Sequence, residues 1–203
     1  MTLTLLHTSP VHLLTFAKLR DRIAPRAIIR QEVREPWLAE ARERGLTPEL
    51  AARLAAFVRA ANGPVICTCT TLGPAAEAAG AIRVDRPMMA EAGRIGGRIV
   101  MAYALESTAR ASLDLLAEHL RPGSSIRPFE MCEHWPLFEA GDIAGFHAAL
   151  ARGVQEEVRT HGGDCVVLAQ VSMAGAAKGL RKLGVPVLTS PELALRAGLA
   201  AAR

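Results

Sequence analysis

The sequence has few aromatic residues and few lysines. Aromatic side chains make up 4% of the 203 residues, and only Lys18, Lys178 and Lys182 among the 24 basic residues are lysines. The arginines are scattered among acidic residues, although the formal net charge is +4. Nucleic-acid binding typically uses a clustered basic surface and, for single strands, aromatic side chains that stack on bases. We therefore expect no nucleic-acid partner.

Long apolar runs are also missing. Half of the residues are hydrophobic, yet no uninterrupted apolar window reaches the length of about 18 residues that a membrane-spanning helix needs. Residues Met1 to Pro10 lack the basic segment and the long apolar core of a secretory signal. The high apolar share and the balanced charge exclude a disordered chain. These features predict a folded, cytoplasmic protein with no membrane partner.

Cysteine is too rare for a disulfide scaffold, because the whole chain has four. The segments Cys67-Thr-Cys69 and Cys132-Glu-His134 contain zinc-type ligands. Structural zinc sites usually pair ligands two to four residues apart and repeat the pair downstream, and neither segment fits that pattern. We expect no metal site.

Short apolar runs alternate with longer segments of helical period along the whole chain. Most of the short runs are apolar throughout, which is typical of parallel strands covered on both faces. The predicted strands are Thr2–His7, Ala27–Gln31, Pro64–Thr68, Ala81–Val84, Arg98–Ala104, Ser125–Met131, Cys165–Ala169 and Val185–Leu188. The predicted helices are Pro10–Ile23, Pro36–Gly45, Pro48–Ala61, Gly73–Ala79, Met88–Gly93, Ser107–Leu120, Ala144–Thr160, Gly175–Leu183 and Pro191–Ala202. This alternation predicts an α/β fold with parallel sheets.

The eight strands divide into two groups of four at Gly93–Gly97. We expect an N-terminal lobe over residues 1–95 and a C-terminal lobe over 96–190, with the helix at 191–203 able to pack back onto the first lobe. A single eight-stranded barrel is disfavoured because 203 residues lies at its lower size limit. The glycines at 93–97 lack the preceding strand and following helix of a dinucleotide-binding motif, so we expect no cofactor. Thr47 and Ser190, each followed by proline, are predicted helix N-caps.

Polar side chains follow four of the predicted strands. Ligands of open α/β sheets bind outside the carboxyl ends of the strands. Hydroxyl groups and helix N-termini at such ends suit a small carboxylate. The candidate site residues at these ends are His7, Thr8, Ser9, Cys69, Thr70, Thr71, Thr108, Gln170 and Ser172.

Two segments carry a family resemblance. Cys69-Thr70-Thr71 matches a Cys-(Asn/Ser/Thr)-Thr motif after a strand, and the run from Asp164 to Val171 follows Asp-x-(Ile/Val)-Val-Leu-Gly-Cys-Thr. The chain thereby resembles the aspartate/glutamate/hydantoin racemase superfamily, including its arylmalonate decarboxylase and maleate isomerase relatives, over nearly its full length. Gln170 stands where this family has its second cysteine.

The resemblance implies two flavodoxin-like lobes related by a pseudo-twofold axis, with a small carboxylate or imide held between them. Family racemases place one cysteine on each side of the substrate α-carbon, and hydroxyl and N–H groups hold the carboxylate. Cys165 begins the strand that leads to Gln170, about 16 Å away, and Cys67 belongs to the same lobe as Cys69. Cys132 matches no family motif. A two-thiol racemase is therefore disfavoured.

Cys69 is then the single thiol, acting in one-sided proton transfer or in nucleophilic addition to an activated double bond. A helix N-terminus after it favours a lowered thiol pKa. Racemisation would need His7, Glu106 or water on the other face. The threonines at 70, 71 and 108 also suit helix capping. A non-catalytic small-molecule-binding or sensor protein of the same fold is the alternative, and an assembly scaffold is a third. A homodimer or higher homo-oligomer is left open.

Overall fold

The computed structural model describes residues 2–203, and these form two compact units. The first unit comprises the chain up to Pro87 together with Pro191–Arg203, and the second comprises Met88–Ser190. Each unit has its own four-stranded sheet, in which all strands run parallel. The α/β class with two small parallel sheets and flanking helices is thus confirmed. The two separate sheets exclude the single eight-stranded barrel.

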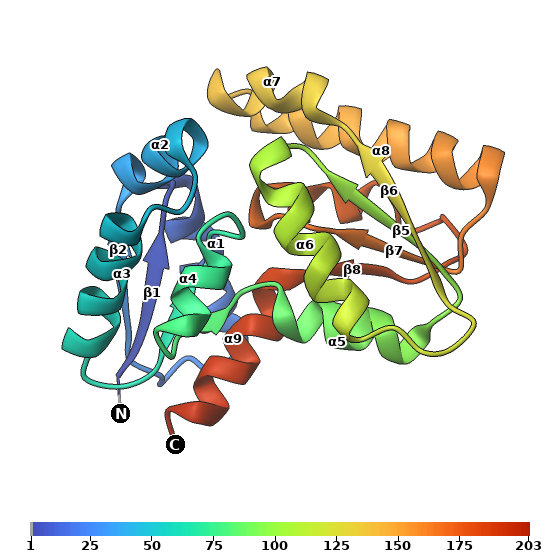
Figure 1. Ribbon diagram of the computed structural model, residues 1–203. Coiled ribbons are helices and arrows are strands. Elements are labelled where there is room, and N and C mark those ends of the chain that lie inside the picture. Colours follow the sequence, from blue (N-terminus) through green and yellow to red (C-terminus); the bar gives the residue numbers. More distant parts are fainter. Residues whose placement is uncertain (1) are drawn as a thin grey trace. The chain divides into compact units, whose positions relative to one another are not determined.

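The sheet of the first unit has the strand order β2-β1-β3-β4. Figure 1 labels β1 and its neighbour β2 in this sheet. Its strands are β1 (Leu3–His7), β2 (Ile29–Val33), β3 (Val65–Cys67) and β4 (Ile82–Arg83). The helices of this part of the chain are α1 (Val11–Ile23), α2 (Glu35–Arg44), α3 (Pro48–Ala60), α4 (Gly73–Ala78) and α9 (Ser190–Ala201). The inner strand β1 is buried along its whole length, whereas the edge strand β2 carries polar side chains. This contrast is expected when only inner strands are covered on both faces.

The second unit repeats this order with strands β6-β5-β7-β8. They are β5 (Arg98–Tyr103), β6 (Ser125–Glu130), β7 (Cys165–Leu168) and β8 (Val187–Thr189). The helical segments are α5 (Arg86–Ile95), which begins in the first unit, α6 (Glu106–Glu118), η1 (Cys132–His134), α7 (Trp135–Glu139), α8 (Ile143–His161) and η2 (Val171–Lys178). Phe146 and Leu150 of α8 pack with Val100 of β5 and Leu168 of β7 to form the core of this unit.

One predicted helix is wrong. The segment expected as a helix over Gly175–Leu183 is instead a 3₁₀ segment, η2, that begins at Val171 and ends at Lys178. Its residues are mostly small, and the ring of His147 lies against Gly175, where an added Cβ would come within 2.2 Å of His147 Cε1. This close approach brings α8 against the backbone of η2. The sequence analysis also missed η1 and α7, both of which are short.

The two predicted N-caps differ in outcome. The Thr47 hydroxyl accepts a hydrogen bond from the backbone N–H of Leu50 at 3.2 Å, which confirms it as a cap. The Ser190 prediction is wrong, because within residues 2–203 its buried hydroxyl has no hydrogen-bond partner. The helix α9 includes Ser190 as its first residue.

No helix within residues 2–203 combines the length and the apolar character needed to cross a membrane.

Candidate functional site

Cys69 lies just beyond the carboxyl end of β3, in the turn that leads to α4. Its side chain is nearly buried, at 7% exposure. Burial raises the pKa of the thiol, and hydrogen bonds to its sulfur oppose this increase. The donors are the hydroxyls of Thr8 and Thr71 and the backbone N–H groups of Thr71 and Leu72. The lowered pKa favoured by the sequence is therefore wrong for the free protein, and the thiol is protonated at rest.

The structure brings two of the expected polar residues of the first unit, Thr8 and Thr71, to this sulfur. Thr8 follows β1, which is hydrogen-bonded to β3 in parallel register, so the two strand ends lie side by side. Thr8, Thr70 and Thr71 are all buried, and Ser9 is half-buried just before α1. The Thr70 carbonyl accepts from the N–H of Gly73 at 3.0 Å, which closes the turn that directly follows the cysteine.

His7 is the last residue of β1 and is fully buried, at 0% exposure. Its Nδ1 lies 2.8 Å from the Thr68 hydroxyl, and its Nε2 lies 3.0 Å from Oε1 of Gln31. Burial lowers the pKa of His7 to about 4, so the ring is neutral at neutral pH. Since both ring nitrogens already have partners, this arrangement suits a residue that positions the loops better than one that exchanges protons with a substrate.

His12, the second residue of α1, was not among the residues predicted from the sequence. Its ring centroid lies 6.2 Å from that of His7, and its side chain is also buried. Burial, with a smaller contribution from the charge of His7, lowers its pKa to about 4. The only sequence signal for this pair was the presence of two histidines five residues apart.

An ion pair that the sequence analysis also missed lies at the end of β4. Arg83 and Asp85 are 4% and 0% exposed. The guanidinium donates two hydrogen bonds to the carboxylate, from Nε to Oδ1 at 3.0 Å and from Nη2 to Oδ2 at 2.8 Å. This pair could not be predicted, because nothing in the sequence of the segment distinguishes a buried arginine from an exposed one.

In the second unit, Gln170 follows β7 and is buried. Its Oε1 accepts a hydrogen bond from the backbone N–H of Ala104 at 2.7 Å, which joins the carboxyl ends of β7 and β5. A cysteine here would offer a much weaker acceptor to that N–H. The amide NH₂ is therefore the part of this side chain best suited to donate to a ligand.

Thr108 and Ser172 are the other expected residues of the second unit, and both are buried. The Thr108 hydroxyl donates to the Leu105 carbonyl at 2.6 Å, within the first turn of α6. This bond favours a role in the helix terminus over contact with a ligand. Ser172 lies in η2, where its backbone carbonyl is 2.8 Å from Nε2 of His147. Both residues follow strands that neighbour each other in the sheet, β5 and β7.

The other three cysteines have environments unlike that of Cys69. Cys67 is fully buried, and burial raises its thiol pKa strongly. Cys165 begins β7, at the opposite end from Gln170, and burial raises its thiol pKa to about 11. Cys132 is half-buried, and burial together with Glu130, Glu106 and Glu133 raises its thiol pKa. Within residues 2–203, no group of three or more histidine, cysteine or acidic side chains is placed to hold a metal ion.

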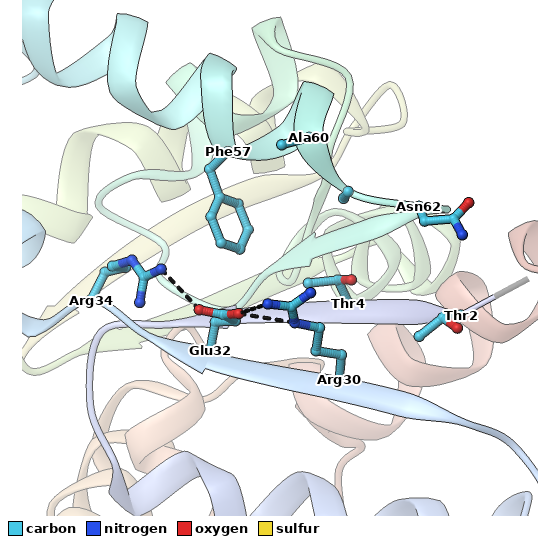
Figure 2. A pocket seen from close by; sticks show the side chains of 9 residues that line it. Thr2, Thr4, Arg30, Glu32, Arg34, Phe57, Ala60 and Asn62 are labelled. Atoms are coloured by element: carbon cyan, nitrogen blue, oxygen red, sulfur yellow. Dashed lines mark hydrogen bonds and ion pairs between the residues drawn. The ribbon is translucent and has the colours of Figure 1, made fainter.

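A separate groove of about 420 Å³ lies between the edge strand β2 and the end of α3 (Figure 2). Arg30 and Arg34 both contact the carboxylate of Glu32, the latter at 2.8 Å, and the Arg34 guanidinium lies 5.7 Å from the centre of the Phe57 ring. Its lining includes none of the strand-end residues named above. Because Glu32 already binds both guanidiniums, we do not place the function in this groove.

Comparison with solved structures identifies the fold. A glutamate racemase from Francisella tularensis in complex with D-glutamate matches with a TM-score of 0.73 and 13% identity, over 98% of this chain and 80% of that one. An aspartate racemase from Picrophilus torridus matches with 0.72 and 12%, over 99% and 93%. The chain has the fold of the aspartate/glutamate racemase superfamily.

An allantoin racemase from Klebsiella pneumoniae shares this racemase fold, with a TM-score of 0.70, 16% identity and coverage of 98% of this chain and 86% of that one. No family model matches the sequence, and no curated protein matches it. The racemase fold is therefore shown by structural similarity, at 12–16% sequence identity.

Proposed function

We propose that the protein is a cofactor-independent enzyme of racemase or isomerase type that acts on a small carboxylate or imide, with Cys69 as its single reactive thiol. The observation that carries this proposal is the set of donors around the Cys69 sulfur, two hydroxyls and two backbone N–H groups. They lie at a strand end, where ligands bind in open α/β sheets. Thr8, Ser9, Thr70 and Thr71 are the proposed carboxylate contacts beside it.

A thiol that is protonated at rest suits proton delivery. In a decarboxylation, the bond between the α-carbon and one carboxylate breaks, carbon dioxide leaves, and the electron pair remains on the substrate as an enediolate. The S–H bond of Cys69 then breaks as its proton forms the new C–H bond. The four donors stabilise the thiolate that is left, and water returns the proton.

In an enolisation the same thiol works from one face only. Transfer of the thiol proton to water gives a thiolate, which removes the α-proton. After the thiol exchanges that proton with solvent, it returns a proton to the same face of the carbon. Gln170 has no proton to exchange at neutral pH, so its position in the second unit offers no second acid or base. We propose Gln170, Ser172 and Thr108 as groups that orient a ligand and not as groups that transfer protons.

A substrate screen in deuterated water tests the proposal. Amino acids, malonates, hydantoins and other small carboxylates or imides are incubated with the protein, and proton NMR follows deuterium uptake at the α-carbon and loss of carboxylate. The proposal expects turnover of at least one member without an added cofactor. Thermal shift on the same panel identifies the members that bind. Members that bind without any exchange or decarboxylation would contradict an enzymatic function.

Two observations favour the alternative, a non-catalytic binding or sensor protein. The thiol pKa of Cys69 is raised, and the oxygen of Gln170 is bound to a backbone N–H. A binding protein needs neither an activated thiol nor a second acid. Stabilisation by a carboxylate that persists fully in Cys69→Ala, with no turnover in either protein, is the result that would select this function.

A further inference from the structure

We propose that the buried ion pair between Arg83 and Asp85 is a positioning device for the reactive thiol, which holds the turn before α4 so that its N–H groups stay on the Cys69 sulfur. This inference rests on the proposed function, because it gives the pair a role toward that thiol. The guanidinium of Arg83 already donates two hydrogen bonds to Asp85, so we give the pair a role through the backbone and not in substrate contact.

The first link runs through Gly73, the residue that begins α4. A Cβ added at Gly73 would lie 2.9 Å from Nε of Arg83 and 3.3 Å from its Cζ. The guanidinium therefore packs directly against the backbone of this glycine. The N–H of Gly73 donates to the Thr70 carbonyl at 3.0 Å and so closes the turn that contains Thr71 and Leu72. The position of the guanidinium thus limits where those two N–H groups can lie.

The second link runs through the sheet. Arg83 is the register partner of Cys67 in the parallel pair of β3 and β4, and the N–H of Val84 donates to the Cys67 carbonyl at 3.1 Å. Cys67 is two residues before Cys69, and its thiol donates to the Cys69 carbonyl at 3.6 Å. The ion pair is thereby fixed to the strand that leads into the thiol turn.

The third link fixes the far end of α4. Arg86 donates two hydrogen bonds to the carboxylate of Glu77, one of them at 2.7 Å, and Nη1 of Arg83 lies 4.0 Å from the same carboxylate. The short helix is therefore held at Gly73 by packing and at Glu77 by charge. A helix of this length has little stability of its own, so its placement depends on such contacts.

Stability alone is a weak reason for burying this pair. Two buried charges lose their hydration, and replacing such a pair with apolar side chains of similar volume often leaves stability unchanged or improves it. A bidentate arginine–carboxylate pair has a fixed plane, however, and it defines geometry in a way that flexible apolar side chains do not. The guanidinium plane against Gly73 is the geometry that the proposed role uses.

Two variants test the role. The double variant Arg83→Met/Asp85→Leu removes both charges together and so leaves no unpaired buried charge. Gly73→Ala keeps the pair and forces the guanidinium away from the turn. The matched control is Arg110→Gln/Asp114→Asn, which removes an exposed pair from α6. Circular dichroism and thermal unfolding establish that each protein is folded.

The readout is the rate at which iodoacetamide alkylates Cys69 as a function of pH, followed by peptide mapping, with Cys132 as the reference in the same sample. A change in the access of iodoacetamide to Cys69 changes the rate by the same factor at every pH. A loss of hydrogen-bond donors to the thiolate instead moves the midpoint of the profile. We expect the midpoint to rise by about one pH unit in both test variants. This shift makes the thiolate fraction about tenfold smaller at any given pH below the midpoint. The Cys132 profile and the control variant should be unchanged.

An unchanged midpoint in a folded double variant overturns the inference. If the double variant does not fold, Gly73→Ala decides alone, and an unchanged midpoint there has the same consequence. The titration needs no substrate, so the two proposals fail separately. A shifted midpoint in a protein without turnover contradicts only the proposed function. Turnover together with an unchanged midpoint contradicts only the positioning role.

Discussion

Nδ1 of His7 lies 2.8 Å from the hydroxyl of Thr68, and this contact joins the two loops that meet at Cys69. Thr8, which follows the histidine, supplies a hydroxyl to the cysteine sulfur, and the cysteine itself follows Thr68. The Thr68 hydroxyl also donates to the Leu6 carbonyl at 3.1 Å. A single buried imidazole thereby sets the spacing between a donor and its thiol.

The first prediction concerns His7→Leu. The substitution leaves the Thr68 hydroxyl and the Gln31 amide without their ring partner, and each lost neutral hydrogen bond costs about 1 kcal/mol. We expect the free energy of unfolding to fall by about 2–3 kcal/mol, as measured by urea denaturation. His134→Leu, at a half-buried position in η1, is the control and should change it less. Equal effects of the two substitutions would contradict the role given to His7.

The second prediction concerns pH. His7 and His12 have pKa values of about 4 in the folded protein, against about 6.5 for an unperturbed histidine. The unfolded chain therefore binds more protons than the folded chain between pH 6.5 and pH 4. The contribution of these histidines to the free energy of unfolding is fully present above about pH 6.5. It decreases as the pH falls toward 4, by up to about 1.4 kcal/mol per pH unit for each histidine.

Urea denaturation at several pH values between 7 and 4.5 measures this slope. Carboxylates also titrate at the lower end of the range, so the slope is compared with that of His7→Gln/His12→Gln. The double variant should be less stable at pH 7 and should lose less stability on acidification to pH 5. Identical slopes in the two proteins would mean that these histidines do not titrate as their burial implies.

The third prediction concerns Gln170. Gln170→Leu removes the acceptor of the buried Ala104 N–H, and an unsatisfied buried donor costs about 1–3 kcal/mol. Gln155→Leu is the control, because that amide donates to the Gly179 carbonyl at an exposed position. We expect Gln170→Leu alone to lower the unfolding free energy by this amount. A stability equal to that of the control would show that the Ala104 N–H finds another partner.

The fourth prediction concerns Gly175. An added methyl group would collide with the ring of His147 and with its Nδ1 at 2.3 Å. Overpacking of this kind costs about 1–3 kcal/mol. We expect Gly175→Ala to lower the melting temperature clearly, and we expect the same change to cost little in a His147→Ala background. Additive effects of the two substitutions would contradict direct packing of the ring on the glycine.

The strands were predictable because their signal is local. The apolar runs around Leu3–His7 and Cys165–Leu168 lie in inner strands that are covered on both faces, so each short run carries its own evidence. The edge strand β2 was placed earlier in the chain than it lies, at Ala27–Gln31, because its polar residues Arg30, Gln31 and Glu32 leave no apolar run to mark where it ends. Its pairing with β1 is what includes them in the sheet.

The candidate thiol could also be named from sequence, since Cys69 and its threonines follow a strand directly. The residues that surround this thiol could not be named from sequence. His7 meets Thr68 across 61 residues of sequence, and Arg83 reaches Gly73 only because β3 and β4 pair. Burial also reversed the expected direction of the thiol pKa, because desolvation outweighs the donors that the turn supplies.

A comparison of Cys69→Ala with Cys132→Ala measures whether the Cys69 thiol transfers the proton. Both are assayed by proton NMR in deuterated water against the substrate that the wild-type protein turns over. We expect Cys69→Ala to lose about 10²–10⁴-fold in rate, the range for removal of a general acid or base, and Cys132→Ala to keep the wild-type rate. Thermal shift establishes that both variants still bind the substrate. Wild-type turnover in a folded Cys69→Ala protein would show that this thiol does not transfer the proton.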